Sequence, residues 1–244
     1  MLGTLLNSGA IFLGAVFGLV TKIEISARLQ HQIKVLLGVA TSFFGLKLVW
    51  IGLKPDSSGS FLHKLGIVLV AMVLGHLIGK LLGIQAWMNR LGQNAKAKLE
   101  RASTEGKNAA SDGLMAAALL FCAAPLGIIG ALEDGLQRYF QPLAIKAVMD
   151  CLAALSFARL FGWTAMLAAI PVAAFLSGFT LLGDRIEPWL ASQGLLGVFH
   201  ACSGLIMTYI ALIIFEIKKV EIGNYLPALI VAPALMKLSR VLFN

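Results

Sequence analysis

The chain has 244 residues, of which 59% are hydrophobic and 13% are charged. A typical soluble domain has about 45–50% apolar and about 25% charged residues. The mean hydropathy of +0.86 is too high for a surface that faces water. This composition excludes a soluble enzyme, a disordered chain and a nucleic-acid-binding protein. It predicts an all-α polytopic protein in contact with the lipid bilayer, since its unbroken apolar runs do not fit a transmembrane β-barrel.

Eight segments are apolar enough, over about 20 residues, to cross a bilayer as helices. In chain order they are 3–20, 35–53, 64–84, 112–132, 143–160, 163–183, 194–216 and 224–242. The first lacks a preceding basic region and is expected to be a retained span, not a cleaved signal peptide. Pro125 lies inside the fourth span and predicts a kink or break there, because proline removes a backbone hydrogen bond.

A polar stretch, residues 85–111, separates the third and fourth predicted spans. Its first part is expected to form an amphipathic helix at the membrane surface, and residues 102–108 are expected to be a linker. The side chains expected to lie on the bilayer are Trp87, Met88, Leu91 and Leu99.

The distribution of lysine and arginine predicts the orientation, because basic residues collect in cytoplasmic loops. Loops after odd-numbered spans hold eleven, against six on the other side. The eleven are Lys22, Arg28, Lys34, Arg90, Lys96, Lys98, Arg101, Lys107, Arg159, Lys218 and Lys219; the six are Lys54, Lys64, Arg138, Arg185, Lys237 and Arg240. The excess places the 85–111 loop in the cytoplasm and both termini in the periplasm of an inner-membrane protein.

Two parts of the chain resemble each other at a shift of 159 residues. Segment 36–53 matches 195–212 at eight of eighteen positions, and the shift places Gly45 on Gly204. Residues 1–84 therefore predict one repeat and 162–244 a second, within a single membrane domain, with the central helices 112–160 unpaired. Because an odd number of spans separates the copies, they would run in opposite directions, an arrangement typical of many secondary transporters and some channels. The alternative is a chance similarity between helices rich in leucine and glycine.

The segment 121–137 is the most unusual in composition. Pro125 would free backbone carbonyls at membrane depth, which could bind a cation or polar solute or could simply mark a packing kink. Glu133 and Asp134 follow. They are charges at the mouth of the protein if the segment spans fully, and buried charges that need partners if it re-enters.

Lys146 and Asp150 are four residues apart in an apolar helix, share one face and can pair. Ionisable residues inside a membrane segment are candidates for a functional site. The alternative is that Lys146 extends toward the outer membrane surface.

Other polar residues lie near the middle or the start of the predicted spans. Those near mid-membrane could line a cavity, although serine and threonine also bond their own helix. Those that open the first and last spans could act as helix caps. The mid-membrane residues are Thr41, Ser42, His200 and Ser203, and the two span-opening residues are Asn7 and Asn224.

Four segments resemble a bacterial inner-membrane family of unknown function, domain of unknown function 554 (YqgA/YdfK-like). They are GTLLNSGAIFLGAVFG, LLFCAAPLGIIGALEDGL, IKAVMDCLAALSFARLFG and NYLPALIVAPAL. The resemblance covers essentially the whole chain and implies a bacterial inner-membrane protein with no established substrate. The chain departs from the family at Pro125, where an apolar residue is expected, and at Lys80, where many relatives are acidic. The positions that match the family are Asn7, Glu133, Lys146, Asp150 and Asn224.

The function that these features favour is secondary transport of a small polar solute or ion, in which the repeats rock about the broken fourth span. The alternatives are an ion or solute channel, which could be a homodimer, and a non-transporting scaffold or lipid-binding protein. The chain carries no catalytic, nucleotide-binding or metal-binding motif. We therefore expect no enzymatic activity, metal or cofactor.

Overall fold

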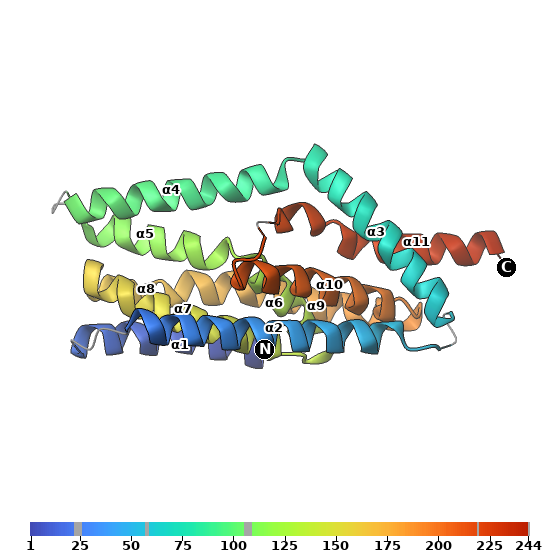
Figure 1. Ribbon diagram of the computed structural model, residues 1–244, viewed down its shortest axis with the longest axis horizontal. Coiled ribbons are helices and arrows are strands. Elements are labelled where there is room, and N and C mark those ends of the chain that lie inside the picture. The colour runs from blue at the N-terminus through green and yellow to red at the C-terminus, as the bar shows by residue number, and fades with distance from the viewer. Residues whose placement is uncertain (22–25, 57–58, 105–108, 219, 244) are drawn as a thin grey trace. The chain divides into compact units, whose positions relative to one another are not determined.

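The computed structural model describes residues 1–21, 26–56, 59–104, 109–218 and 220–243. Every regular element in these ranges is helical, which confirms the all-α prediction (Figure 1). The elements are α1 (Leu2–Val20), α2 (Ala27–Leu53), α3 (Phe61–Leu81), α4 (Ile84–Thr104), α5 (Ala109–Cys122), α6 (Pro125–Gln137), α7 (Gln141–Phe161), α8 (Thr164–Leu167), α9 (Ala169–Ser192), α10 (Leu196–Ile214), η1 (Ile222–Tyr225) and α11 (Ala228–Phe243). Three of the loop cations, Lys22, Lys107 and Lys219, lie outside the described residues.

Six candidate spans are found in the described residues. They are Leu2–Val20, Ala27–Leu53, Phe61–Leu81, Thr164–Ser192, Leu196–Ile214 and Ile222–Leu242. The pair Ser111–Cys122 and Pro125–Gln137, bent by 61°, is a seventh candidate if it counts as one span. The remaining predicted span, α7, is a helix of 21 residues but is not among these candidates. The predicted number of eight spans is therefore not confirmed.

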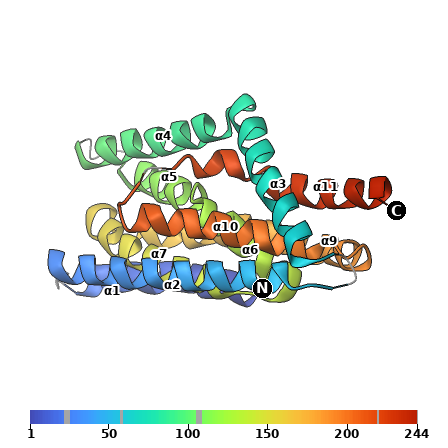
Figure 2. The same cartoon turned by 45° about the vertical axis from the view of Figure 1, so that its right-hand side comes forward.

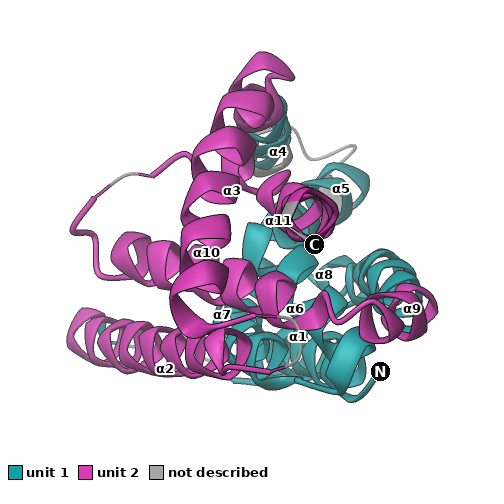
Figure 3. Cartoon of the chain, turned by 90° about the vertical axis from the view of Figure 1, so that its right-hand side faces the viewer, with its two compact units in different colours: residues 1–26, 87–184 teal, residues 27–86, 185–244 magenta. Residues whose placement is uncertain are grey.

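The helices form two compact units, which we describe separately (Figure 3). Unit 1 contains residues 1–26 and 87–184. Its main contact is between α1 and α7 (Figure 1). Gly14 and Gly18 of α1 lie directly against the backbone carbonyls of Cys151 and Leu155, so that a methyl group at either glycine would overlap a carbonyl oxygen. This spacing is the small-xxx-small pattern that allows membrane helices to approach closely.

The break between α5 and α6 has the position that Pro125 predicts. Pro125 is the first residue of α6, where its missing N–H costs no hydrogen bond, and Ala124 before it is the N-cap, which makes no side-chain hydrogen bond. The two helices pack into an apolar core shared with α1, α7 and α9. The larger residues of this core are Ile11, Phe121, Leu143, Val172 and Leu176.

The helix α4 differs in two ways from the prediction for residues 85–111. It continues to Thr104, so the first residues of the predicted linker are helical, and residues 105–108 lie outside the described part of the chain. Trp87 is exposed as predicted, whereas Met88 is buried in the protein instead of lying on the bilayer. The helix therefore uses part of its apolar face for packing.

Unit 2 contains residues 27–86 and 185–244. In this unit α2 packs against α10, and α3 packs against α11 (Figure 2). Gly45 lies against Gly204, and Gly52 lies against Gly197, which shows that α2 and α10 run antiparallel. Each of these glycines has its partner's carbonyl where a β-carbon would be, so the two backbones are in direct contact.

Glycine has two different roles toward the carboxyl end of α3. Gly75 and Gly79 lie against the backbones of Ala228 and Asn224, as their four-residue spacing predicts. Gly83 does not join this contact: its φ of 65° is in the left-handed region, and it forms the turn into α4.

Lys64, counted above as a loop cation, is instead buried near the start of α3, where it pairs with Asp56 at 2.7 Å.

Candidate functional site

Lys146 and Asp150 form a buried ion pair on one face of α7. Only 2% of Lys146 and 7% of Asp150 are exposed, and the ammonium group of Lys146 donates to Oδ2 of Asp150. The four-residue spacing brings the two side chains together within one helix, as predicted. Lys146 therefore does not extend to the membrane surface, because its charged end is held inside the protein.

Asn7 completes this cluster from a different helix. It lies in the second turn of α1, whose N-cap is Met1, so the predicted capping role of Asn7 is wrong. Its Nδ2 instead donates to Oδ2 of Asp150 across 2.9 Å, and its Oδ1 has no hydrogen-bond partner in the part of the chain that the structure describes. The residue is fully buried. Asp150 thus receives two donors, one from the ammonium of Lys146 and one from the amide of Asn7.

The side chain of Lys146 lies beside the break between α5 and α6. Its Nζ is 5.9 Å from the ring centroid of Phe121, within the range of a cation–π contact. A β-carbon on Gly127 would come within 2.9 Å of its Cε, so the glycine in the first turn of α6 leaves room for the lysine. The structure therefore brings together the two features that the sequence singled out, the ion pair and the broken helix.

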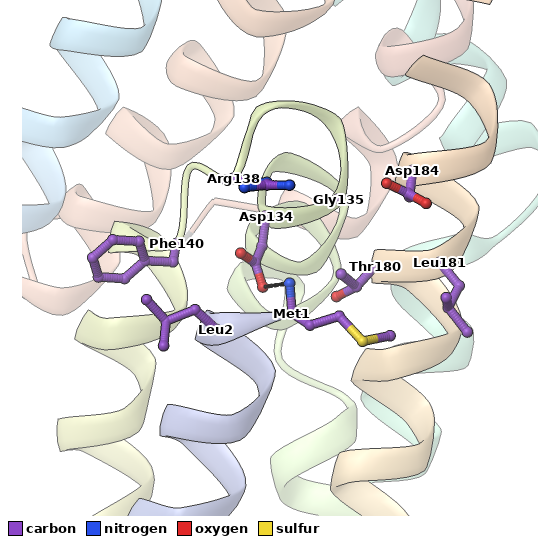
Figure 4. Close-up of a pocket in the computed structure, with 9 residues that line it drawn as sticks. All are labelled: Met1, Leu2, Asp134, Gly135, Arg138, Phe140, Thr180, Leu181 and Asp184. Carbon is purple, nitrogen blue, oxygen red and sulfur yellow. Dashed lines mark ion pairs between the residues drawn. The ribbon is translucent and has the colours of Figure 1, made fainter. Parts of the chain in front are cut away.

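Glu133 and Asp134 are buried near the carboxyl end of α6, with 0% and 1% of each residue exposed. Oδ2 of Asp134 accepts a hydrogen bond of 3.0 Å from the N–H of Gly3 and lies 2.9 Å from the α-ammonium of Met1 (Figure 4). A carboxylate at the start of a helix is stabilised by the free N–H groups and by the helix dipole. Asp134 is therefore held by the start of α1, and both acids are buried instead of facing water.

Burial, together with the charge of Glu133, raises the pKa of Tyr139 to about 12. Its backbone N–H donates to the carbonyl of Glu133 after the end of α6. Tyr139 therefore contributes a neutral hydroxyl, and no charge, to this end of unit 1 at physiological pH.

A line of polar contacts on α1 connects Asp134 with the ion pair. Gly3 binds Asp134, the hydroxyl of Thr4 lies 3.0 Å from that of Thr180, and Asn7 binds Asp150. The line ends at Ile11, which belongs to the apolar core. Sequence reasoning missed Thr4 and Thr180, although Thr4 lies three residues before Asn7 and so on the same face of a helix.

The remaining predicted residues lie in unit 2 and are not part of this cluster. Thr41 is buried and donates to the carbonyl of Leu37 in its own helix, and Ser203 is buried with no partner for its hydroxyl among the described residues. His200 is also buried, and Ser42 is half-buried. Their predicted role as the walls of one cavity stays a prediction.

Asn224 has a structural role that differs from the predicted cap of the last span. Its Oδ1 accepts a hydrogen bond of 3.1 Å from the N–H of Gln85 at the start of α4, and its Nδ2 donates to Glu221. The side chain of Gln85 in turn accepts from the N–H of Gly223. Asn224 therefore satisfies the first turn of a different helix.

The cluster of Lys146, Asp150 and Asn7 does not suit a metal ion, because it combines one carboxylate and one amide with an ammonium group. Over the ranges that the structure describes, no three His, Cys, Asp or Glu residues are grouped as a metal site requires. This cluster can form ion pairs and hydrogen bonds, and it can exchange one charged group for another.

The model of the protein family DUF554, described as a protein of unknown function, matches residues 2–237. The chain belongs to the DUF554 family. It is 25% identical to an uncharacterized membrane protein, YdfK of Bacillus subtilis (strain 168), over 236 residues that cover 97% of this chain and 96% of that protein. It is also 29% identical to an uncharacterized protein, YqgA of Escherichia coli (strain K12), over 237 residues that cover 95% and 94% of the two chains. No solved structure matches it.

Family membership and the apolar helices together identify this DUF554 chain as a membrane protein. Large apolar side chains such as Leu5, Phe12 and Phe17 are exposed on α1. Such side chains are stable when lipid covers them. The predicted contact with the bilayer is thereby supported, and the predicted family is confirmed.

Proposed function

We propose that this DUF554 chain is a secondary transporter, and not an enzyme, that moves a small polar solute or ion across the bacterial inner membrane. The observation that carries the proposal is the buried Lys146–Asp150 pair beside the broken α5–α6 helix. A channel lined by the same groups is the first alternative, and a scaffold or lipid-binding protein is the second. A homodimer is compatible with each of these functions.

A buried ion pair with a third polar partner can act as a switch. A charged side chain alone in the membrane interior costs roughly 3 kcal/mol or more, so neither Lys146 nor Asp150 is stable without a counter-charge. A cationic group or a proton that binds Asp150 would release Lys146, while Asn7 keeps its hydrogen bond to the carboxylate. Lys146 then has no counter-charge and must move to water or to another acidic group, so binding at Asp150 would be coupled to a movement of the lysine.

The broken helix supplies a place where such an exchange could be coupled to motion. Interrupted helices near the interface of two repeats are the usual position of a transport site. The 61° bend between α5 and α6 lies next to Lys146, whose side chain packs closely against Gly127 in the first turn of α6. A change in the position of Lys146 would therefore act directly on this bend.

The glycine contacts of unit 2 support an inverted repeat. A β-carbon on Gly45 would meet Gly204 and Thr208, and one on Gly204 would meet Gly45 and Val49. The shift of 159 residues places Gly45 on Gly204 and Val49 on Thr208, so the two contacts are equivalent. An antiparallel pair with equivalent contacts is what two copies related by a two-fold axis in the membrane plane would form.

Transport is tested with the purified chain in proteoliposomes on a solid support, using rapid exchange to solutions of Na⁺, of lower pH or of L-leucine. We expect at least one of these to give a saturable current or uptake that is lost in the double variant Lys146→Met/Asp150→Asn. The control is Lys47→Met, which changes an exposed lysine of α2. A conductance that does not saturate would favour the channel, and no flux with any of the probes would favour the scaffold.

The orientation is tested independently of transport. The excess of basic residues in loops after odd-numbered spans predicts that both termini face the periplasm. Alkaline phosphatase fused to either end should be active, and green fluorescent protein fused to either end should be dark. Opposite results at the two ends would require an odd number of spans and would contradict the predicted scheme of eight.

A further inference from the structure

A cavity of about 560 Å³ lies in unit 1 where α1 begins and α6 ends (Figure 4). Its volume is in the range that holds small ligands. The lining combines charged and apolar side chains from α1, α6, α9 and the turn before α7. The lining residues are Met1, Leu2, Asp134, Gly135, Arg138, Phe140, Thr180, Leu181 and Asp184.

Opposite charges line this cavity, and while the α-ammonium of Met1 pairs with Asp134, Arg138 and Asp184 form no ion pair among the described residues. The side chains of Arg138 and Asp184 have no ion-pair or hydrogen-bond partner among the described residues, and both residues are exposed. Figure 4 shows Arg138 above Asp134, with Asp184 on the neighbouring helix. Asp134 is buried, and its Oδ1 has no hydrogen-bond partner within the described ranges. A ligand that carries both charges could therefore satisfy groups that the protein leaves unpaired.

The backbone fixes the positions of these charged residues. Gly135 and Gly183 lie against each other where α6 crosses α9, and a β-carbon on Gly183 would be 3.2 Å from Cα of Gly135. Asp134 and Asp184 are the chain neighbours of these two glycines, so the contact holds both carboxylates at the same end of the helices. Arg138 ends α6 with a φ of 56°, a conformation that glycine adopts more easily than arginine.

We propose that this cavity binds a small zwitterion with an apolar side chain, such as an α-amino acid. Its carboxylate binds the guanidinium of Arg138, its ammonium group binds Asp184, and its side chain contacts Leu2, Phe140 and Leu181. Arginine suits this role because its planar group can donate two parallel hydrogen bonds to a carboxylate. The polar line from Gly3 through Thr4 to Asn7 begins at this cavity.

The binding site stands on the cavity alone; calling the zwitterion a substrate rests on the proposed function. Binding is measured on the full chain in detergent as the shift in thermal unfolding, followed by tryptophan fluorescence, because a ligand of the folded state raises its apparent stability. The probes are L-leucine, 4-methylpentanoate, which lacks the ammonium group, and 3-methylbutylamine, which lacks the carboxylate. The variants are Arg138→Gly and Asp184→Asn, and the control is Gln137→Ala, whose exposed residue does not line the cavity.

We expect L-leucine to stabilise the parent and the control, and to bind about tenfold or more weakly to both variants, because each loses a charge-assisted hydrogen bond. Both single-charge probes should bind the parent at least about tenfold more weakly than leucine. Asp184→Asn changes an exposed residue and decides the outcome if Arg138→Gly fails to fold. The proposal is overturned if leucine does not shift the parent, if either single-charge probe matches leucine, or if both variants bind leucine as the parent does. Leucine binding without any flux would reject the proposed function and retain the binding site. Flux of another probe without leucine binding would reject the binding site and retain the proposed function.

Discussion

Removing one partner of the Lys146–Asp150 pair is expected to destabilise the protein by about 3–5 kcal/mol, because the charge that remains is buried and unpaired. Lys146→Met should be the milder change, since Asp150 keeps the amide of Asn7 as a donor. Asp150→Asn keeps an amide oxygen that can accept from the ammonium group, but it removes the counter-charge and leaves the ring of Phe121 as a weaker electrostatic contact. The measurement is the free energy of unfolding in detergent for each variant.

The double variant Lys146→Met/Asp150→Asn separates folding from transport. It should be more stable than either single variant, because no isolated charge is left, and it should have lost transport if the pair is the switch. Lys47→Met serves as the control for removing a lysine from a membrane helix. If all three variants unfolded like the parent, the pair would have access to water, and the transport site would have to be sought around Pro125 and Glu133.

The same substitution at two glycines of α1 should have opposite effects. Gly14→Ala is expected to cost about 1–3 kcal/mol or more, because the added methyl group overlaps the carbonyl of Cys151 and the helices must separate. Gly9→Ala adds the methyl group where no atom lies within 4 Å. It should be neutral or stabilise the helix by up to about 1 kcal/mol, since alanine is the better helix former.

The unfolding free energies of these two variants, measured side by side, test whether α1 and α7 are held together by backbone contact. A matched pair on one helix removes differences in helix propensity from the comparison. Equal effects at the two positions would contradict the packing described for Gly14.

The sequence could predict the features that depend on neighbouring residues. Pro125 predicts a break because proline lacks a donor, and α5 and α6 separate at that position. Lys146 and Asp150 can pair because they are one turn apart. The glycines at positions 14 and 18 predict a close helix contact by their spacing, and they make one.

The sequence could not predict the features that depend on residues far apart in the chain. Asn7 near the start of a span is typical of a cap, and only the approach of α7 shows that it binds Asp150 instead. The contact of Thr4 with Thr180 joins helices 176 positions apart and has no local signal. The cavity beside Asp134 likewise depends on Asp184, which lies 50 positions further along the chain.

The contact between α1 and α7 places unequal demands on the two helices. At Gly14 and Gly18 the side chain itself must be absent, so nearly every substitution is excluded. On α7 the contact is made by the carbonyl groups of Cys151 and Leu155, which every amino acid supplies. Mutational tolerance should therefore be one-sided: α1 can hardly vary along this line, whereas the facing positions of α7 are free to change and to acquire new side chains without weakening the contact.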